Sequence, residues 1–118
     1  MANGPGIYNF PAMVRGDTFR ARDLASDVSQ DGVPLALTSA RMQVRALLSG
    51  DVLLEWASCE ITGDDSNTVR LSAKTSDEMQ VLPIGAHLYD LEVIFASDGA
   101  KLTLLAGKFP ITEDITRD

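Results

Sequence analysis

The chain has 118 residues, a formal net charge of −7 and a pI near 4.5. Its length is that of one domain, with a core large enough to fold without disulfides or metals, and a hydrophobic share of 45% is too high for a disordered chain. Because so acidic a chain repels phosphate backbones and anionic lipid surfaces, we expect neither nucleic acid nor a membrane as a partner.

The N-terminal segment predicts a flexible start over residues 1–6, followed by a single β-sandwich domain over residues 7–118. Pro11 in "IYNFPAM" lacks a backbone donor, which confines this strand to a sheet edge or a bulge. An unpaired edge with aromatic side chains can add to a neighbour's sheet. The candidate partner contacts are Tyr8, Phe10 and Met13, together with Ile115 in the C-terminal tail. In the alternative, Tyr8 and Phe10 only cover their own sandwich.

A first hairpin is expected in "ARMQVRALLSGDVLLEWASCEIT", residues 40–62. Before it, Asp31 and Gly32 predict a tight turn. Within it, alternation places an apolar set on the inner face and Arg41, Gln43 and Arg45 on the other. The turn falls at residues 49–51, and residues 52–61 form the return arm, which contains Trp56. The inner set consists of Met42, Val44, Ala46 and Leu48.

The C-terminal third predicts one helical turn and a second hairpin. Thr75 and Glu78 have the spacing of a capping box, so a short helical turn is expected near 75–81. In residues 85–112 the alternation separates an inner phase from an outer phase that carries Asp90 and Glu92, with Asp98 and Gly99 as a type I′ turn. The inner phase is His87, Tyr89, Leu91, Val93 and Phe95.

Short strands with turns every eight to twelve residues are typical of an antiparallel sandwich. The fold class predicted is therefore all-β, an immunoglobulin-like antiparallel β-sandwich of about 7–9 strands with one short helical turn.

Residues capable of chemistry are scarce. His87 is the only histidine and lies in the inward phase, and Cys59 has no flanking cation to lower its pKa. One Cys and one His cannot supply four ligands to zinc. We predict no catalytic residue, no cofactor and no metal. Asp90 and Glu92 have the residue types of a glycosidase pair, but cross-strand ion pairs with Arg45 and Arg41 are the favoured interpretation.

The order of several turn and core motifs resembles a small domain of tailed-phage and prophage virions. The segments that carry the resemblance are "VRGDTF", "DGVPLALTSARMQVR" and "LSAKTSDEMQVLPIGAHLYDLEVIFASDGAKLTLLAGKFPITEDITR". The chain is similar in these segments, over nearly its whole length, to the N-terminal immunoglobulin-like domain of phage baseplate upper proteins.

The resemblance implies a non-enzymatic virion structural protein that is synthesised in the host cytoplasm. Its expected partners are other virion proteins, and a homo-oligomer is expected on assembly. Two alternatives from other classes stay open at this point. One is a carbohydrate-binding or host-directed binding module, which needs exposed aromatic side chains, and the other is a glycosidase that uses Asp90 and Glu92.

Overall fold

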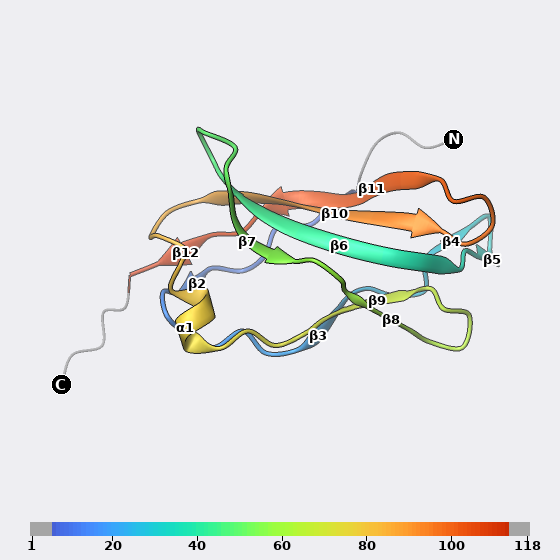
Figure 1. The fold of residues 1–118 in the computed structure, drawn as a ribbon, viewed down its shortest axis with the longest axis horizontal. Coiled ribbons are helices and arrows are strands. Elements are labelled where there is room, and N and C mark those ends of the chain that lie inside the picture. Colours follow the sequence, from blue (N-terminus) through green and yellow to red (C-terminus); the bar gives the residue numbers. More distant parts are fainter. Residues whose placement is uncertain (1–5, 114–118) are drawn as a thin grey trace.

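A computed structural model of the protein describes residues 6–113. It is a two-layer, all-β sandwich with one short helix at the edge of the layers (Figure 1). The larger layer is a five-stranded sheet in the order β1-β11-β10-β6-β7. Its strands are β1 (Gly6–Ile7), β11 (Lys101–Lys108), β10 (His87–Phe95), β6 (Leu37–Ala46) and β7 (Val52–Trp56).

The opposing layer is a three-stranded sheet in the order β3-β9-β8. Its strands are β3 (Arg22–Ala25), β9 (Thr68–Leu71) and β8 (Glu60–Thr62). Two small pairs complete the fold, a parallel pair of β12 (Ile111–Thr112) with β2 (Met13–Val14) and a hairpin of β4 (Ser29–Gln30) with β5 (Val33–Pro34). The predicted sandwich is thus confirmed. Its strands are shorter and more numerous than expected, and the pairings of β1 with β11 and of β12 with β2 are parallel.

The extra strands have a local cause in the first hairpin. Its return arm was expected to run unbroken over residues 52–61, but the chain bends at residues 57–59. β7 therefore stays in the five-stranded sheet while β8 joins the opposing sheet. The backbone amide of Cys59 donates to the carbonyl of Ala40 at 2.8 Å, which fixes this crossing between the layers.

The two long strands at the sheet centre follow the predicted alternation. β10 and β6 pair antiparallel from His87 opposite Ala46 to Phe95 opposite Leu37. The inward side chains Tyr89, Leu91 and Val93 are buried, as predicted. The β10–β11 turn differs from the prediction, because a type I′ turn needs positive φ at both central residues and of Asp98 and Gly99 only Gly99 has it.

Aromatic rings fill the space between the layers. Phe10 packs against Tyr89 and Phe109 with ring centroids 4.9 and 4.8 Å apart, and Phe19 packs against Trp56 at 5.0 Å. Edge-to-face packing of this kind adds to the free energy gained from burial. The core is therefore assembled from residues far apart in the sequence.

The N-terminal strand lies at a sheet edge, as predicted from Pro11. Gly6 belongs to β1, so strand pairing begins within the stretch expected to be flexible, and the rest of that stretch lies outside the described residues. Beyond β1 the chain crosses over Gly107, where a Cβ atom would approach the carbonyl oxygen of Tyr8 to 2.1 Å. A side chain of any size at position 107 is incompatible with this crossing.

The predicted helical turn is present as α1 (Ser76–Met79). Its N-cap is Thr75, whose hydroxyl accepts from the amide of Glu78, while the Glu78 carboxylate accepts from the amide of Thr75. The bond from the Thr75 amide lowers the pKa of Glu78, because a backbone donor stabilises the ionised carboxylate. The capping box was correctly identified from spacing alone.

Candidate interaction surface

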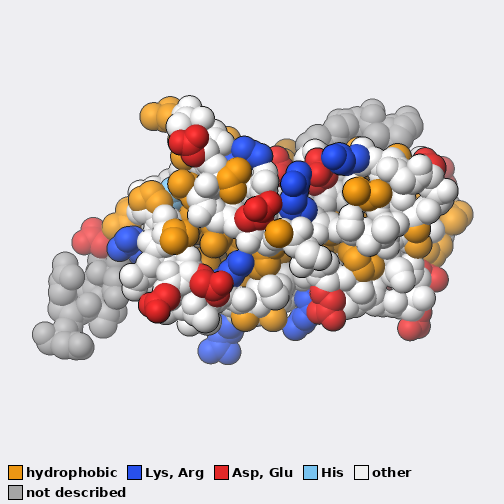
Figure 2. All heavy atoms as spheres, viewed as in Figure 1, with side chains coloured by type: hydrophobic (Ala, Val, Ile, Leu, Met, Phe, Trp, Pro, Cys, Tyr) orange, Lys and Arg blue, Asp and Glu red, His pale blue; other side chains and the backbone are white. Residues whose placement is uncertain are grey.

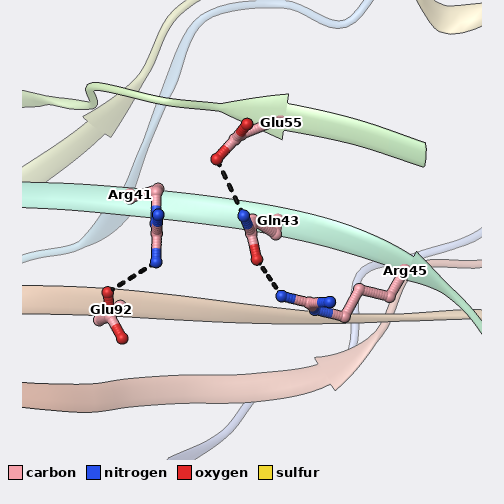
Figure 3. Close-up of polar contacts among 5 residues, drawn as sticks. All are labelled: Arg41, Gln43, Arg45, Glu55 and Glu92. Carbon is pink, nitrogen blue, oxygen red and sulfur yellow. Dashed lines mark hydrogen bonds and ion pairs between the residues drawn. The ribbon is translucent and has the colours of Figure 1, made fainter. Parts of the chain in front are cut away.

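Of the two carboxylates considered for hydrolysis, Glu92 lies beside Arg41 in a row of polar side chains on the outer face of the larger sheet (Figure 3). Glu92 accepts from Nη2 of Arg41 at 3.0 Å, which confirms the predicted cross-strand ion pair. Arg45 does not reach Asp90. It donates to Oε1 of Gln43 and to the carbonyl of Gly50 instead.

The remaining polar side chains of this face extend the same row. Gln43 donates to Oε2 of Glu55 at 2.9 Å, so hydrogen bonds connect β6 to both of its neighbours. Side chains of both charges alternate along the row, and the Arg41–Glu92 pair is partly solvated, with exposed fractions of 45% and 27%. This arrangement maintains strand register. Glu92 lines a shallow concavity together with Arg41, and Asp90 lines a different one together with Arg45 and Lys108, so the two carboxylates are not brought together across one cleft as in a glycosidase pair.

The two potential nucleophile or base residues are both buried. Nε2 of His87 lies 2.7 Å from the carbonyl oxygen of Pro83 and therefore carries the proton that it donates, while the buried Nδ1 has no hydrogen-bond partner. Burial raises the pKa of the Cys59 thiol to about 11, so the thiol stays protonated at neutral pH. Neither side chain is placed to attack a substrate.

No group of three or more His, Cys, Asp or Glu side chains that could hold a metal ion occurs within residues 6–113. Over the same residues no helix is long and apolar enough to cross a membrane.

Trp56 does not form a sugar-binding platform. Trp56 is only 2% exposed, and its indole Nε1 donates to the carbonyl of Ser72 at 2.8 Å. The ammonium group of Lys74 covers the ring at 5.0 Å. The carbohydrate-binding hypothesis requires an exposed aromatic face, which Trp56 does not provide.

The partner contacts predicted from the sequence fall into different environments. Phe10 is 3% exposed and belongs to the core, so its assignment as a contact residue is wrong, because Tyr89 and Phe109 close around it from distant strands. Tyr8 is 44% exposed, and its ring packs on Phe10. Met13 is half-buried against the core. Ile115 lies outside the described residues.

Leu48, the most exposed large apolar side chain among the described residues, lies on a turn whose exposure the sequence pattern missed. The β6–β7 turn projects from the body of the sandwich (Figure 1), and hydrophobic side chains are at its far end (Figure 2). Leu48 is 97% exposed and Leu47 52%, and Val52 follows at 43%. We call the turn with these three residues the leucine tip. Leu48 was expected on the inner face, but β6 ends at Ala46 and the chain turns away before reaching it.

Hydrogen bonds hold the leucine tip in one conformation. The amide of Gly50 donates to the carbonyl of Ala46 at 3.0 Å, and the amide of Ala46 donates to the carbonyl of Asp51 at 2.8 Å. The guanidinium of Arg45 donates to the carbonyl of Gly50 at 3.0 Å. Since the backbone is already ordered, contacts made by the leucines lose little conformational entropy.

An apolar groove lies at the opposite end of the larger sheet, between the start of β11 and the β4–β5 hairpin. Its volume is about 420 Å³, and its apolar wall is formed by Val28, Leu35, Phe95, Leu102 and Leu104. The amide of Ala96 donates to the carbonyl of Ala36 and that of Leu35 to the carbonyl of Val28, which fixes both sides of the groove. Asp98 lies at its rim.

Charge is distributed unevenly between the two ends. Exposed aspartates lie on the loops at the end of the molecule that carries β4 and β5 (Figure 1), and Asp98 is at the groove rim. They are Asp27, Asp31, Asp64, Asp65 and Asp98. Arg45 and Asp51 flank the leucine tip, and Asp90 and Lys108 line a concavity that also contains Arg45. The molecule therefore has an apolar groove with aspartates at one end and an apolar projection flanked by charges of both signs at the other.

Comparison with known proteins adds information on the fold. No family model matches the chain, and no curated protein matches it. Among solved structures, CopC from Methylosinus trichosporium OB3b is similar, with a TM-score of 0.50, 13% sequence identity, and coverage of 98% of this chain and 91% of that chain. At this identity the similarity shows a shared β-sandwich fold and nothing of the function.

The prediction of a phage virion structural protein is corrected by these comparisons. CopC, with which the chain shares its fold, is not a phage protein, and no family model or curated protein connects the chain to a virion. The motifs behind the prediction are turn residues and alternating core positions. Any sandwich of this topology needs them, so their order indicates the fold without indicating the function.

Proposed function

We propose that this chain is a non-catalytic interaction module whose leucine tip inserts into an apolar recess of a protein partner. The observation that carries the proposal is the nearly complete exposure of Leu48 at the end of a projecting, hydrogen-bonded turn. Burying such a side chain in a partner stabilises a complex by about 1.5–3 kcal/mol. Isolated exposed leucines are common on protein surfaces, but two adjacent ones on a rigid projection form a preorganised contact.

The charged side chain beside the leucine tip indicates which kind of partner surface would complement it. Arg45 flanks the turn and keeps its guanidinium partly exposed while it supports the backbone. An apolar recess with a carboxylate at its rim therefore complements the leucine tip better than an uncharged recess does. This partner chemistry is consistent with the buried states of His87 and Cys59, since the module needs no reactive group of its own.

Site-specific photo-crosslinking tests the proposal directly. A benzophenone amino acid is placed at position 48 in the cell that makes the protein, and the matched control carries it at Arg41 on the flat polar face. We expect a discrete protein adduct from position 48 and none from position 41. Equal adducts from both positions, or no protein adduct from position 48, would contradict the proposal.

A further inference from the structure

The leucine tip and the apolar groove are complementary, and they lie at opposite ends of the same molecule. β6 runs from Leu37 beside the groove to Ala46 at the base of the tip, so the sheet separates the two features by the length of a ten-residue strand. We propose that the partner of the leucine tip is the groove of a second copy of this chain, which gives head-to-tail association. This inference rests on the proposed function, that the leucine tip is a contact surface.

The groove has the size and surface that the tip requires. An apolar protein cavity of about 150 Å³ accommodates a benzene molecule. The groove volume of about 420 Å³ therefore has room for the two branched side chains of Leu47 and Leu48. Its wall is half-buried, with Phe95, Leu102 and Leu104 packed on the core from behind, so it presents an ordered apolar surface.

The charges at the two ends favour this arrangement over a symmetric one. In a head-to-tail contact, Arg45 beside the tip of one copy approaches the end of the other copy that carries Asp98 at the groove rim. Two groove ends facing each other would bring their aspartates together, which is unfavourable in a chain of net charge −7. Charge complementarity therefore favours a contact between the tip of one copy and the groove of another over a contact between two grooves.

The contact is heterologous, so the assembly differs from a closed dimer. After one contact forms, one copy still has a free groove and the other a free tip, so addition continues into a ring or an open chain. A hairpin turn seated in a groove buries less surface than the roughly 1,200 Å² of a stable complex, so we expect weak association that requires high protein concentration.

Sedimentation equilibrium on the purified full chain measures this association. Wild-type protein is studied from about 20 μM to about 2 mM, the range in which weak complexes form. Leu48→Ser removes the tip contact without disturbing the core, because Leu48 is 97% exposed. Ile7→Ser is the matched control, since Ile7 is 72% exposed and lies on β1 outside the tip. We expect the wild type and Ile7→Ser to exceed the dimer mass, and Leu48→Ser to show at least a tenfold weaker association.

Mixing two variants distinguishes a heterologous contact from a symmetric one. Ala100→Lys places a charged side chain at the groove, at an exposed position that the fold does not need. Leu48→Ser and Ala100→Lys should each stay monomeric alone. Their mixture should form a one-to-one dimer and nothing larger, because only one intact tip and one intact groove can meet.

Three results would overturn the inference. They are a monomeric wild type over the whole range, undiminished association of either variant alone, and a mixture that stays monomeric although the wild type associates. The photo-crosslinking experiment at position 48 shows whether such a result rejects only self-association or also rejects the proposed function of the leucine tip. An adduct with another protein, together with a monomeric wild type, leaves the module function standing and rejects self-association.

Discussion

Gly107→Ala tests the packing of the N-terminal strand against β11. The added Cβ atom would lie 2.1 Å from the carbonyl oxygen of Tyr8 and 2.9 Å from Oδ1 of Asn9, and real Cβ atoms essentially never approach closer than 3.0 Å. Both contacts are with the segment that follows β1, and neither is the end of a long flexible side chain. The segment must therefore move away from β11.

The hydrogen bonds of this segment set the magnitude. The amide of Tyr8 donates to the carbonyl of Ala106 and that of Lys108 to Asn9 Oδ1, at 3.0 and 2.9 Å. The hydroxyl of Tyr89 donates to the carbonyl of Tyr8 at 2.6 Å. With a net value of about 1 kcal/mol for each bond, their loss lowers the free energy of unfolding by about 3 kcal/mol. For a domain of this size the melting temperature should fall by about 10 °C.

Urea denaturation followed by circular dichroism measures this loss, with calorimetry for the melting temperature. Tyr89→Phe is the matched control, because it removes one of the hydrogen bonds without a steric clash, and it should lower the free energy of unfolding by about 1 kcal/mol. If Gly107→Ala is no more destabilising than Tyr89→Phe, the segment that contains Tyr8 and Asn9 does not cross Gly107 as closely as described.

The remaining predictions concern the core, the polar face and the thiol. Phe10→Ala should lower the free energy of unfolding by about 3–5 kcal/mol in urea denaturation. A loss below about 0.5 kcal/mol would show that Phe10 lies on the surface and not in the core. A double-mutant cycle of Arg41→Met with Glu92→Gln should give a coupling energy below about 1 kcal/mol, because the pair is partly solvated, and a larger value would show a buried pair. Because the folded-state pKa of Cys59 is raised from 9.0 to about 11, stability should fall as the pH rises through this interval, and Cys59→Ala should reduce that fall in melts at pH 8–11. An unchanged pH profile in Cys59→Ala would show that the thiol does not titrate as described.

Local patterns in the sequence predicted the parts of the fold that depend on local chemistry. The spacing of Thr75 and Glu78 located the helical turn, because a capping box involves only four consecutive residues. Alternation assigned the faces of β6 and β10, because successive side chains of a strand point to opposite sides. In both cases the residues that decide the structure are neighbours in the chain.

The candidate site could not be predicted, because its position depends on where strands leave the sheet. Alternation continues through Leu48, but the turn closes at Ala46, whose amide donates to Asp51 and whose carbonyl accepts from Gly50, and the apolar side chains that follow point to solvent. The prediction that Phe10 contacts a partner was wrong for the opposite reason. Its burial depends on Tyr89 and Phe109, about eighty and one hundred positions further along the chain, which no local pattern connects to it.

Amide chemical-shift mapping locates the surfaces through which two copies of the chain meet. A trace of ¹⁵N-labelled wild-type protein is titrated with unlabelled protein up to about 2 mM, the range of weak complexes. Our account predicts shift changes confined to two regions, residues 46–52 of the leucine tip and the groove segments 28–35 and 95–104. Changes centred on the polar row of Arg41 and Glu92, or no changes at any concentration, would contradict it.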